Sequence, residues 1–291
     1  MKSNNTENSP RQSGVGALKA NQNHAGKELA NTWRIIQTEP VLKILFAHRS
    51  IRQFKPNAPI STEHKQVIES AAQRAATSCS GQMYSFVEVS DPKLRNALFK
   101  LAGKQQPILD ASLFYVVLGD LYRLDQLVEK AGATCQIGSH SGAMITACDA
   151  SLAAQNLVLA AEALGYGTLY IGNVGDQCDA VAKLLRLPPR VIPLYGIAVG
   201  MPAESPPARP RIDNQLVFHR NEYKTATDRE LGQAIAHMTQ QLEEEGYYRK
   251  YTARSNYTWR DHLAQKFGGK WLREVERQRE QFIKKALGKT H

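Results

Sequence analysis

Residues 113–120 read LFYVVLGD, residues 191–200 read VIPLYGIAVG, and residues 148–165 read CDASLAAQNLVLAAEALG. The first two are near-continuous apolar runs of strand length, which is typical of strands buried on both faces. The third is rich in Ala and Leu on nearly every side and carries no charge between Asp149 and Glu162. It therefore predicts a helix that is buried on most sides, at the centre of a domain or in a subunit interface.

Flanking patterns complete an α+β sandwich with a mixed sheet of about four or five strands. Further strands are predicted at residues 84–90 and 168–172, and residues 48–54 are expected to be extended. The prolines of residues 201–213 exclude a helix there, and two or three helices are expected over residues 227–250 and 260–287. Capping residues and helix breakers predict the other helix boundaries. Pro40 is expected to split a helix over residues 31–47, and Asp149 and Gly165 to begin and end the central helix. Three further N-caps are expected: Ser61 for a helix over 62–76, Asp91 for the helix that begins at Pro92, and Asp176 for a helix over 177–187.

The composition is that of an ordinary globular protein, with 42% hydrophobic and 22% charged residues in a chain of 291. No stretch approaches the roughly 20 apolar residues that a transmembrane helix needs. Residues 1–30 are polar and are expected to be a disordered leader, not a secretion signal, while residues 31–291 are expected to form one domain of a cytoplasmic protein. Cysteines without a CxxC pair and histidines without ligand spacing predict no metal site.

The formal net charge of +10 raises the alternative of a basic nucleic-acid-binding protein without redox activity. From residue 241 to residue 291, twelve Lys and Arg stand against seven acids on helical spacing, which is typical of a solvated helix face. The chain has no RNP motif, helix-turn-helix signal or zinc finger. A positive field also suits anionic ligands such as a phosphate-bearing cofactor.

Two arginine-bearing segments could hold a phosphate. If residues 48–54 are extended, His48, Ser50 and Arg52 face one way, and guanidinium and hydroxyl groups are donors that phosphate oxygens accept. A surface strand with salt bridges fits the same spacing. Arg209 and Arg211 alternate with prolines that stiffen the backbone, although a solvated basic loop would look the same.

Residues 76–82 (ATSCSGQ) and Gln105 could meet a flat polar ring, because small hydroxylic residues allow close backbone approach and an amide can bond a ring edge. Each could also be an ordinary surface turn or amide. No nucleophile with its base accompanies these segments. That absence fits an enzyme whose cofactor carries the chemistry.

Five ordered motifs together give a more specific indication: HRSIRQF (48–54), ATSCSGQ (76–82), LGYGTLYIGN (164–173), LRLPPRVIPLYGIAVGMPAESPPARPR (185–211) and SNYTWRDH (255–262). In this order they resemble the nitroreductase family, in the branch of the major oxygen-insensitive nitroreductase and flavin reductase P. The resemblance covers about residues 40–287. It implies a nitroreductase-like three-layer sandwich, with a mixed, mainly antiparallel sheet flanked by helices and a C-terminal helical extension.

The resemblance also implies FMN, bound noncovalently at the interface of a homodimer. Gln105 and the backbone of Tyr170, Ile171 and Gly172 would face the flavin, whereas Asn173 stands where relatives have a second glycine. The other implied flavin contacts are His48, Arg49, Ser50 and Arg52 around the phosphate, Ser78 and Ser80 near the ring, and Arg209 and Arg211 on the phosphate, with arginine at 209 where close relatives have lysine.

The implied reaction is ping-pong: hydride passes from NADPH or NADH to FMN and then to a nitroaromatic, a quinone or free flavin. Relatives carry a longer Asn-Arg-Arg stretch before the tryptophan of the last motif, which is thought to reach the 2′-phosphate of NADPH. Here only Arg254 remains of that stretch, so the choice between NADPH and NADH stays open. Small-molecule acceptors are the expected partners, without a membrane or a specific nucleic acid, and a reductase of the same fold tuned to another acceptor is the nearest alternative.

Overall fold

The computed structural model describes residues 25–252 and 256–288, and the chain divides into two compact units. Unit 1 comprises Met1–His48 and Pro207–Gly268; unit 2 comprises Arg49–Pro206 and Gly269–His291. The elements of unit 1 are α1 (Ala25–Thr38), α2 (Pro40–Ala47), the 3-10 helix η3 (Asn214–Leu216), α10 (Asp228–Glu244), α11 (Tyr247–Thr252) and α12 (Trp259–Phe267). Unit 2 contains the sheet.

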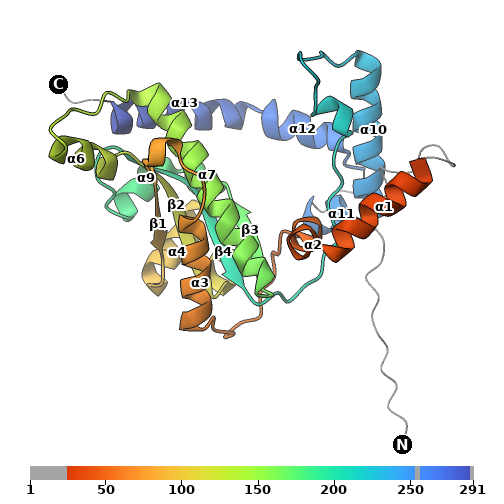
Figure 1. The fold of residues 1–291 in the computed structure, drawn as a ribbon, viewed down its shortest axis with the longest axis horizontal. Helices are drawn as coiled ribbons and strands as arrows, with labels where there is room; N and C mark the ends of the chain where they lie inside the picture. Colours follow the sequence, from red (N-terminus) through yellow and green to blue (C-terminus); the bar gives the residue numbers. More distant parts are fainter. Residues whose placement is uncertain (1–24, 253–255, 289–291) are drawn as a thin grey trace, which may run out of the picture. The chain divides into compact units, whose positions relative to one another are not determined.

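The strands of unit 2 are β1 (Tyr84–Glu88), β2 (Leu113–Asp120), β3 (Gly167–Ile171) and β4 (Val191–Gly200). Its helices are α3 (Thr62–Gln73), the 3-10 helix η2 (Ser78–Ser80), α4 (Pro92–Leu101), α5 (Pro107–Asp110), α6 (Tyr122–Lys130), α7 (Ser139–Ala163), α8 (Asn173–Asp176), α9 (Cys178–Leu184) and α13 (Lys270–Leu287). Figure 1 shows these elements along the chain.

The four strands lie in the order β1-β2-β4-β3, and all neighbouring strands are antiparallel. Outside β3, Ser50 forms an isolated parallel bridge with Thr168. The predicted extended segment at residues 48–54 therefore runs beside the edge of the sheet. The predicted α+β fold with a mainly antiparallel sheet is confirmed, and its parallel pairing is limited, among the described residues, to the bridge at Ser50. The two outer strands are β1 and β3.

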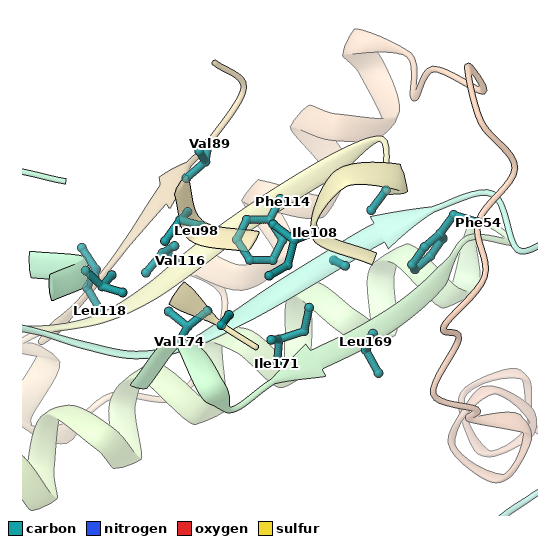
Figure 2. Close-up of a cluster of buried hydrophobic side chains, with 14 of the residues drawn as sticks. Phe54, Val89, Leu98, Ile108, Phe114, Val116, Leu118, Leu169, Ile171 and Val174 are labelled. Atoms are coloured by element: carbon teal, nitrogen blue, oxygen red, sulfur yellow. The ribbon is translucent and has the colours of Figure 1, made fainter. Parts of the chain in front are cut away.

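Alternating side chains of β2 divide between two cores, which makes the sandwich three layers deep. Leu113, Tyr115 and Val117 face α3 and α7, while Phe114 and its alternate neighbours face the helices on the other side. Figure 2 shows this second core, with Phe114 beside Ile108. All eight residues of β2 are buried, as its apolar run predicts.

The long helix α7 confirms one predicted boundary and corrects another. Gly165 lies just beyond its end with a φ of +84°, the left-handed conformation that favours glycine. Asp149 is not its N-cap, because α7 begins ten residues earlier at Ser139 and Asp149 is buried at 1% exposure. The predicted loop within residues 121–145 lies at 131–138 and contains Gly132 and Gly138, whereas Gly142 is helical and a Cβ there would stand 2.7 Å from Cδ1 of Leu121. α7 has the length and apolar composition of a membrane span, yet its inner face covers the sheet as a core helix does.

Other predicted boundaries follow the same chemistry. The side chain of Ser61 caps α3 and that of Asp91 caps α4, while Pro40 begins α2. Asp176 does not cap the following helix: it ends α8, and its carboxylate pairs with Arg279 at 2.6 Å. No helix occurs in residues 201–213, and the C-terminal region forms four helices, α10 to α13. α1 begins within the stretch predicted to be a leader, and residues 1–24 lie outside the described residues.

Candidate functional site

Residues 49–52, which we call the edge segment, are held along β3 by backbone hydrogen bonds. The amide of Ile51 donates to the carbonyl of Thr168 at 2.9 Å. From the other side, Oε1 of Glu204 accepts from the amides of Arg52 and Gln53 at 2.6 and 3.2 Å. One short stretch is thus clamped between a strand and a carboxylate that follows β4.

The side chains of the edge segment alternate as the sequence predicts. Ile51 points into the core and is 6% exposed, and Gly167 leaves the room for it, since a Cβ there would stand 2.6 Å from Cγ1 of Ile51. Ser50 and Arg52 consequently lie on the opposite side. The guanidinium of Arg52 donates back to the backbone carbonyl of Ser50 at 3.2 Å, which keeps the cation close to the backbone of Ser50.

A turn follows the end of β3, four residues beyond Thr168. Nε2 of Gln105 donates to Oδ1 of Asn173 at 2.9 Å, which joins the predicted glutamine to the predicted turn. Gly172 has a φ of −64°, and a Cβ built on it would meet nothing within 4 Å. The turn therefore has open space over its backbone, where a planar group could approach closely.

Tyr170 points to the other face of the sheet. Its hydroxyl donates to Oε1 of Gln155 on α7 at 3.3 Å, and its ring meets Tyr195 edge-on with centroids 5.5 Å apart. Burial raises the pKa of Tyr170, so the hydroxyl stays protonated at neutral pH. Only its backbone is available to the turn, as the resemblance implies.

Residues 77–82, which we call the hydroxyl loop, have an unusual backbone. Cys79, Ser80 and Gln82 have φ values of 49°, 55° and 48°, in the left-handed region that costs a non-glycine residue about 1–2 kcal/mol. Gly81, in contrast, has an ordinary φ of −74°. Strain concentrated in this way occurs most often at binding and catalytic sites.

Within one chain, the hydroxyl loop and the edge segment do not come together. The loop leads into Tyr84 of β1, which pairs with Gly119 at one end of β2. Ser50 lies on the outer side of β3, where it pairs with Thr168. Thr168 pairs with Val199 of β4, and Val199 pairs in turn with Leu113 at the other end of β2. Four strand spacings of about 4.8 Å and six residues of about 3.4 Å put Tyr84 and Ser50 roughly 28 Å apart. These are diagonally opposite corners of the sheet.

The remaining predicted residues belong to unit 1, where Arg209 has partners of its own. Its guanidinium pairs with Glu245 at 2.7 Å and lies 3.7 Å from the ring centroid of Tyr247. Arg211 is exposed and donates to two backbone carbonyls nearby. His48 follows the end of α2, and Arg254 lies outside the described residues. A shared phosphate for Arg52, Arg209 and Arg211 stays a prediction.

Sequence reasoning missed two carboxylates that hold these segments. Glu204 lies in a proline-rich stretch with no pattern of its own, so nothing local indicated that it binds the amide of Arg52. Asp149 had a usable signal: it is the single charge in a long apolar stretch of α7 before Glu162. A charge in such a place needs hydrogen-bonding partners from another element.

The fold and these segments define a class of protein: a three-layer α+β sandwich whose sheet edge presents arginine and hydroxyl groups along β3, the strand that ends in an open glycine turn. The Nitroreductase family model matches residues 45–201, more than half of the chain. FMN reductase (NADPH) of Bacillus subtilis is 38% identical over 189 residues, which cover 64% of this chain and 76% of that one. The oxygen-insensitive NADPH nitroreductase of Salmonella typhimurium is 34% identical over 224 residues, with coverage of 77% and 89%.

Solved structures agree with these sequence matches. A nitroreductase structure from Bacillus subtilis superposes with a TM-score of 0.72 at 33% identity, covering 82% of this chain and 98% of that one. The chain belongs to the nitroreductase family.

Proposed function

We propose that this protein is an NADPH-dependent flavin oxidoreductase that binds FMN noncovalently and reduces small oxidised compounds. The observation that carries the proposal is the clamped edge segment, which holds the guanidinium of Arg52 near the backbone of Ser50 along β3, the strand that ends in the open turn at Gly172. Membership of the nitroreductase family, and relatives named as an FMN reductase and an NADPH nitroreductase, support the same assignment.

The donors present suit FMN. Arg49, Ser50 and Arg52 supply the charge and hydroxyl that a ribityl phosphate accepts, with His48, Arg209 and Arg211 as further donors. Gln105 and the backbone of residues 170–172 suit the polar edge of a flat ring. When bound, FMN supplies the hydride chemistry, and the chain supplies binding, orientation and a positive field.

A homodimer is part of the proposal, because one chain keeps Ser50 of the edge segment and Tyr84, which follows the hydroxyl loop, roughly 28 Å apart. That distance exceeds the length of an extended FMN molecule. A second copy can bring its own Ser78 and Ser80 to the ring of a flavin whose phosphate is bound by Arg52 of the first copy. Met144 and Leu152 on the outer face of α7 are 72% and 48% exposed, and such apolar side chains suit a subunit interface.

We further propose a ping-pong reaction in the cytoplasm, with NAD(P)H and the acceptor using the same open face in turn. Nitroaromatics, quinones and free flavins are the acceptor class, and a single preferred quinone would use the same site. Arg254 is the proposed contact for the 2′-phosphate of NADPH.

The purified full-length protein tests the proposal in one cuvette. We expect a yellow solution with a blue absorption band that NADPH bleaches and a quinone restores; adding NADH to a second sample ranks the two donors. A colourless protein that takes up no added FMN, and that binds DNA with strong salt dependence, would favour the nucleic-acid alternative instead. The ion pairs along α13, such as Lys284 with Glu280, already use much of its basic face.

A further inference from the structure

The hydroxyl loop has a backbone conformation that its own residues do not favour, and Asp149 holds it in that conformation. Three of its residues other than glycine adopt the left-handed conformation, while its one glycine does not need it. The loop's own sequence therefore does not favour the shape that the loop takes. Some interaction from outside the loop has to hold it.

That interaction comes from a single carboxylate on α7. Oδ1 of Asp149 accepts from the amide of Ser78 at 2.9 Å, and Oδ2 accepts from the amide of Met83 at 3.1 Å and from the hydroxyl of Thr77. Oγ1 of Thr77 accepts in turn from the amide of Gln82 at 2.8 Å. The entry and the exit of the loop are thus tied to one buried group.

We infer that Asp149 is a positioning residue for the flavin ring: it holds the hydroxyl loop in the left-handed conformation that presents Ser78 and Ser80. This inference rests on the proposed function. Asp149 itself is 1% exposed and does not reach solvent or ligand. Its effect passes through the backbone of the loop.

The chemistry requires a carboxylate at this position. All three partners of Asp149 are donors, and an ionised carboxylate is purely an acceptor. An asparagine of the same size would turn an NH₂ group toward at least one donor. Burial of a charge in the apolar middle of α7 is unfavourable unless the charge is hydrogen-bonded. We attribute its presence to the need to order a strained loop.

The substitution Asp149→Asn is expected to weaken FMN binding at least about ten-fold, because a lost charge-assisted hydrogen bond has about that effect on affinity. It should also shift the visible absorption band of whatever flavin still binds, because the loop is assigned to the ring. Thr77→Val removes only the hydroxyl relay, so it should weaken binding by a smaller factor in the same direction.

Rescue distinguishes positioning from general destabilisation. Glycine adopts left-handed φ values freely, so Cys79→Gly in the Asp149→Asn background should restore part of the FMN affinity. The matched control is Asp125→Asn, because the hydrogen bonds of the Asp125 carboxylate go to Arg190, at 2.7 Å for the shortest, and not to the hydroxyl loop. That variant should lower the melting temperature and leave FMN affinity unchanged.

The experiment measures FMN dissociation constants by flavin fluorescence, together with melting temperatures, for the wild type and these four variants. Weaker binding in Asp149→Asn, partial rescue by Cys79→Gly and normal binding in Asp125→Asn support the inference. Wild-type affinity in Asp149→Asn, or an equal loss in Asp125→Asn, overturns it while the proposed function stands. If Asp149→Asn does not fold, wild-type affinity in Thr77→Val overturns it. A wild-type protein that takes up no FMN overturns both the proposed function and the inference.

Discussion

The edge segment and the hydroxyl loop are both assigned to the flavin, but the fold holds them in different ways. The edge segment is extended chain outside the four strands: the amide of Ile51 donates to the backbone of β3, and the carboxylate of Glu204 accepts from the amide of Arg52. The hydroxyl loop is strained, and a single buried carboxylate ties down both of its ends. In our proposal, charge recognition rests on an extended segment held at the sheet edge, whereas close approach to the ring rests on an irregular backbone that is held from outside the loop.

The largest effect is expected at the edge segment. Arg52→Ala should weaken FMN binding roughly 100-fold, because a guanidinium–phosphate interaction with two charge-assisted hydrogen bonds is lost. A fluorescence titration of the apoprotein measures the change. The control is Arg273→Ala on the exposed face of α13, which should bind FMN as the wild type does. Full flavin retention by Arg52→Ala would remove the phosphate role from this residue.

A substitution in the turn after β3 should have the next largest effect on FMN affinity. Gly172→Ala places a methyl group in space that holds no protein atom within 4 Å, at a φ that alanine accepts. Stability should therefore stay unchanged while FMN affinity falls roughly ten-fold, since the methyl group would occupy the approach to the ring. Gly232→Ala, which also meets nothing within 4 Å, is the matched control. Unaltered affinity and reduction rate would place the ring elsewhere.

Loss of the Glu204 clamp on the edge segment should have a smaller effect on FMN affinity. Glu204→Ala removes the acceptor for the amides of Arg52 and Gln53, so the segment loosens and FMN affinity should fall about five-fold. Glu204→Gln retains an acceptor oxygen and should lose less. If both variants lose FMN affinity equally, the charge of Glu204 determines the effect and its hydrogen bonds to the edge segment do not.

The smallest effect concerns strain in the hydroxyl loop. Cys79→Gly in the otherwise wild-type chain should raise the melting temperature by about 1–2 °C, because relief of a left-handed residue slightly exceeds the added freedom of the unfolded chain. Cys148→Gly, in the right-handed helix α7, should lower it instead. Thermal unfolding monitored by circular dichroism compares the two. A lower melting temperature for Cys79→Gly would mean that this position carries no strain.

Local patterns predicted the parts of the fold that local chemistry determines. The apolar runs of β2 and β4, the caps at Ser61 and Asp91, and the break at Pro40 all appear where the sequence places them. Asp149 was misassigned because a helix cap and a buried acceptor for a distant loop look alike in one dimension. Only contacts with residues about 70 positions away distinguish them.

In the candidate site too, features set by neighbouring residues were predicted and features set by long-range contacts were not. The alternation that sets Ser50 and Arg52 opposite Ile51 could be read from residues 48–54, because a strand has a period of two. The separation of the hydroxyl loop from that segment could not, because it depends on strand order and register. Sheet topology is set by long-range pairing, which adjacent residues do not encode.

Complementation between two defective chains tests most directly whether one flavin site takes its two segments from two copies. Arg52→Ala and Ser80→Trp, the second at an exposed position of the hydroxyl loop, should each abolish tight FMN binding as homodimers. After the two are dissociated and reassembled together, half of the dimers are mixed and carry one intact site. We predict that FMN occupies about a quarter of all sites. A mixture that binds no more FMN than either parent would contradict the shared site.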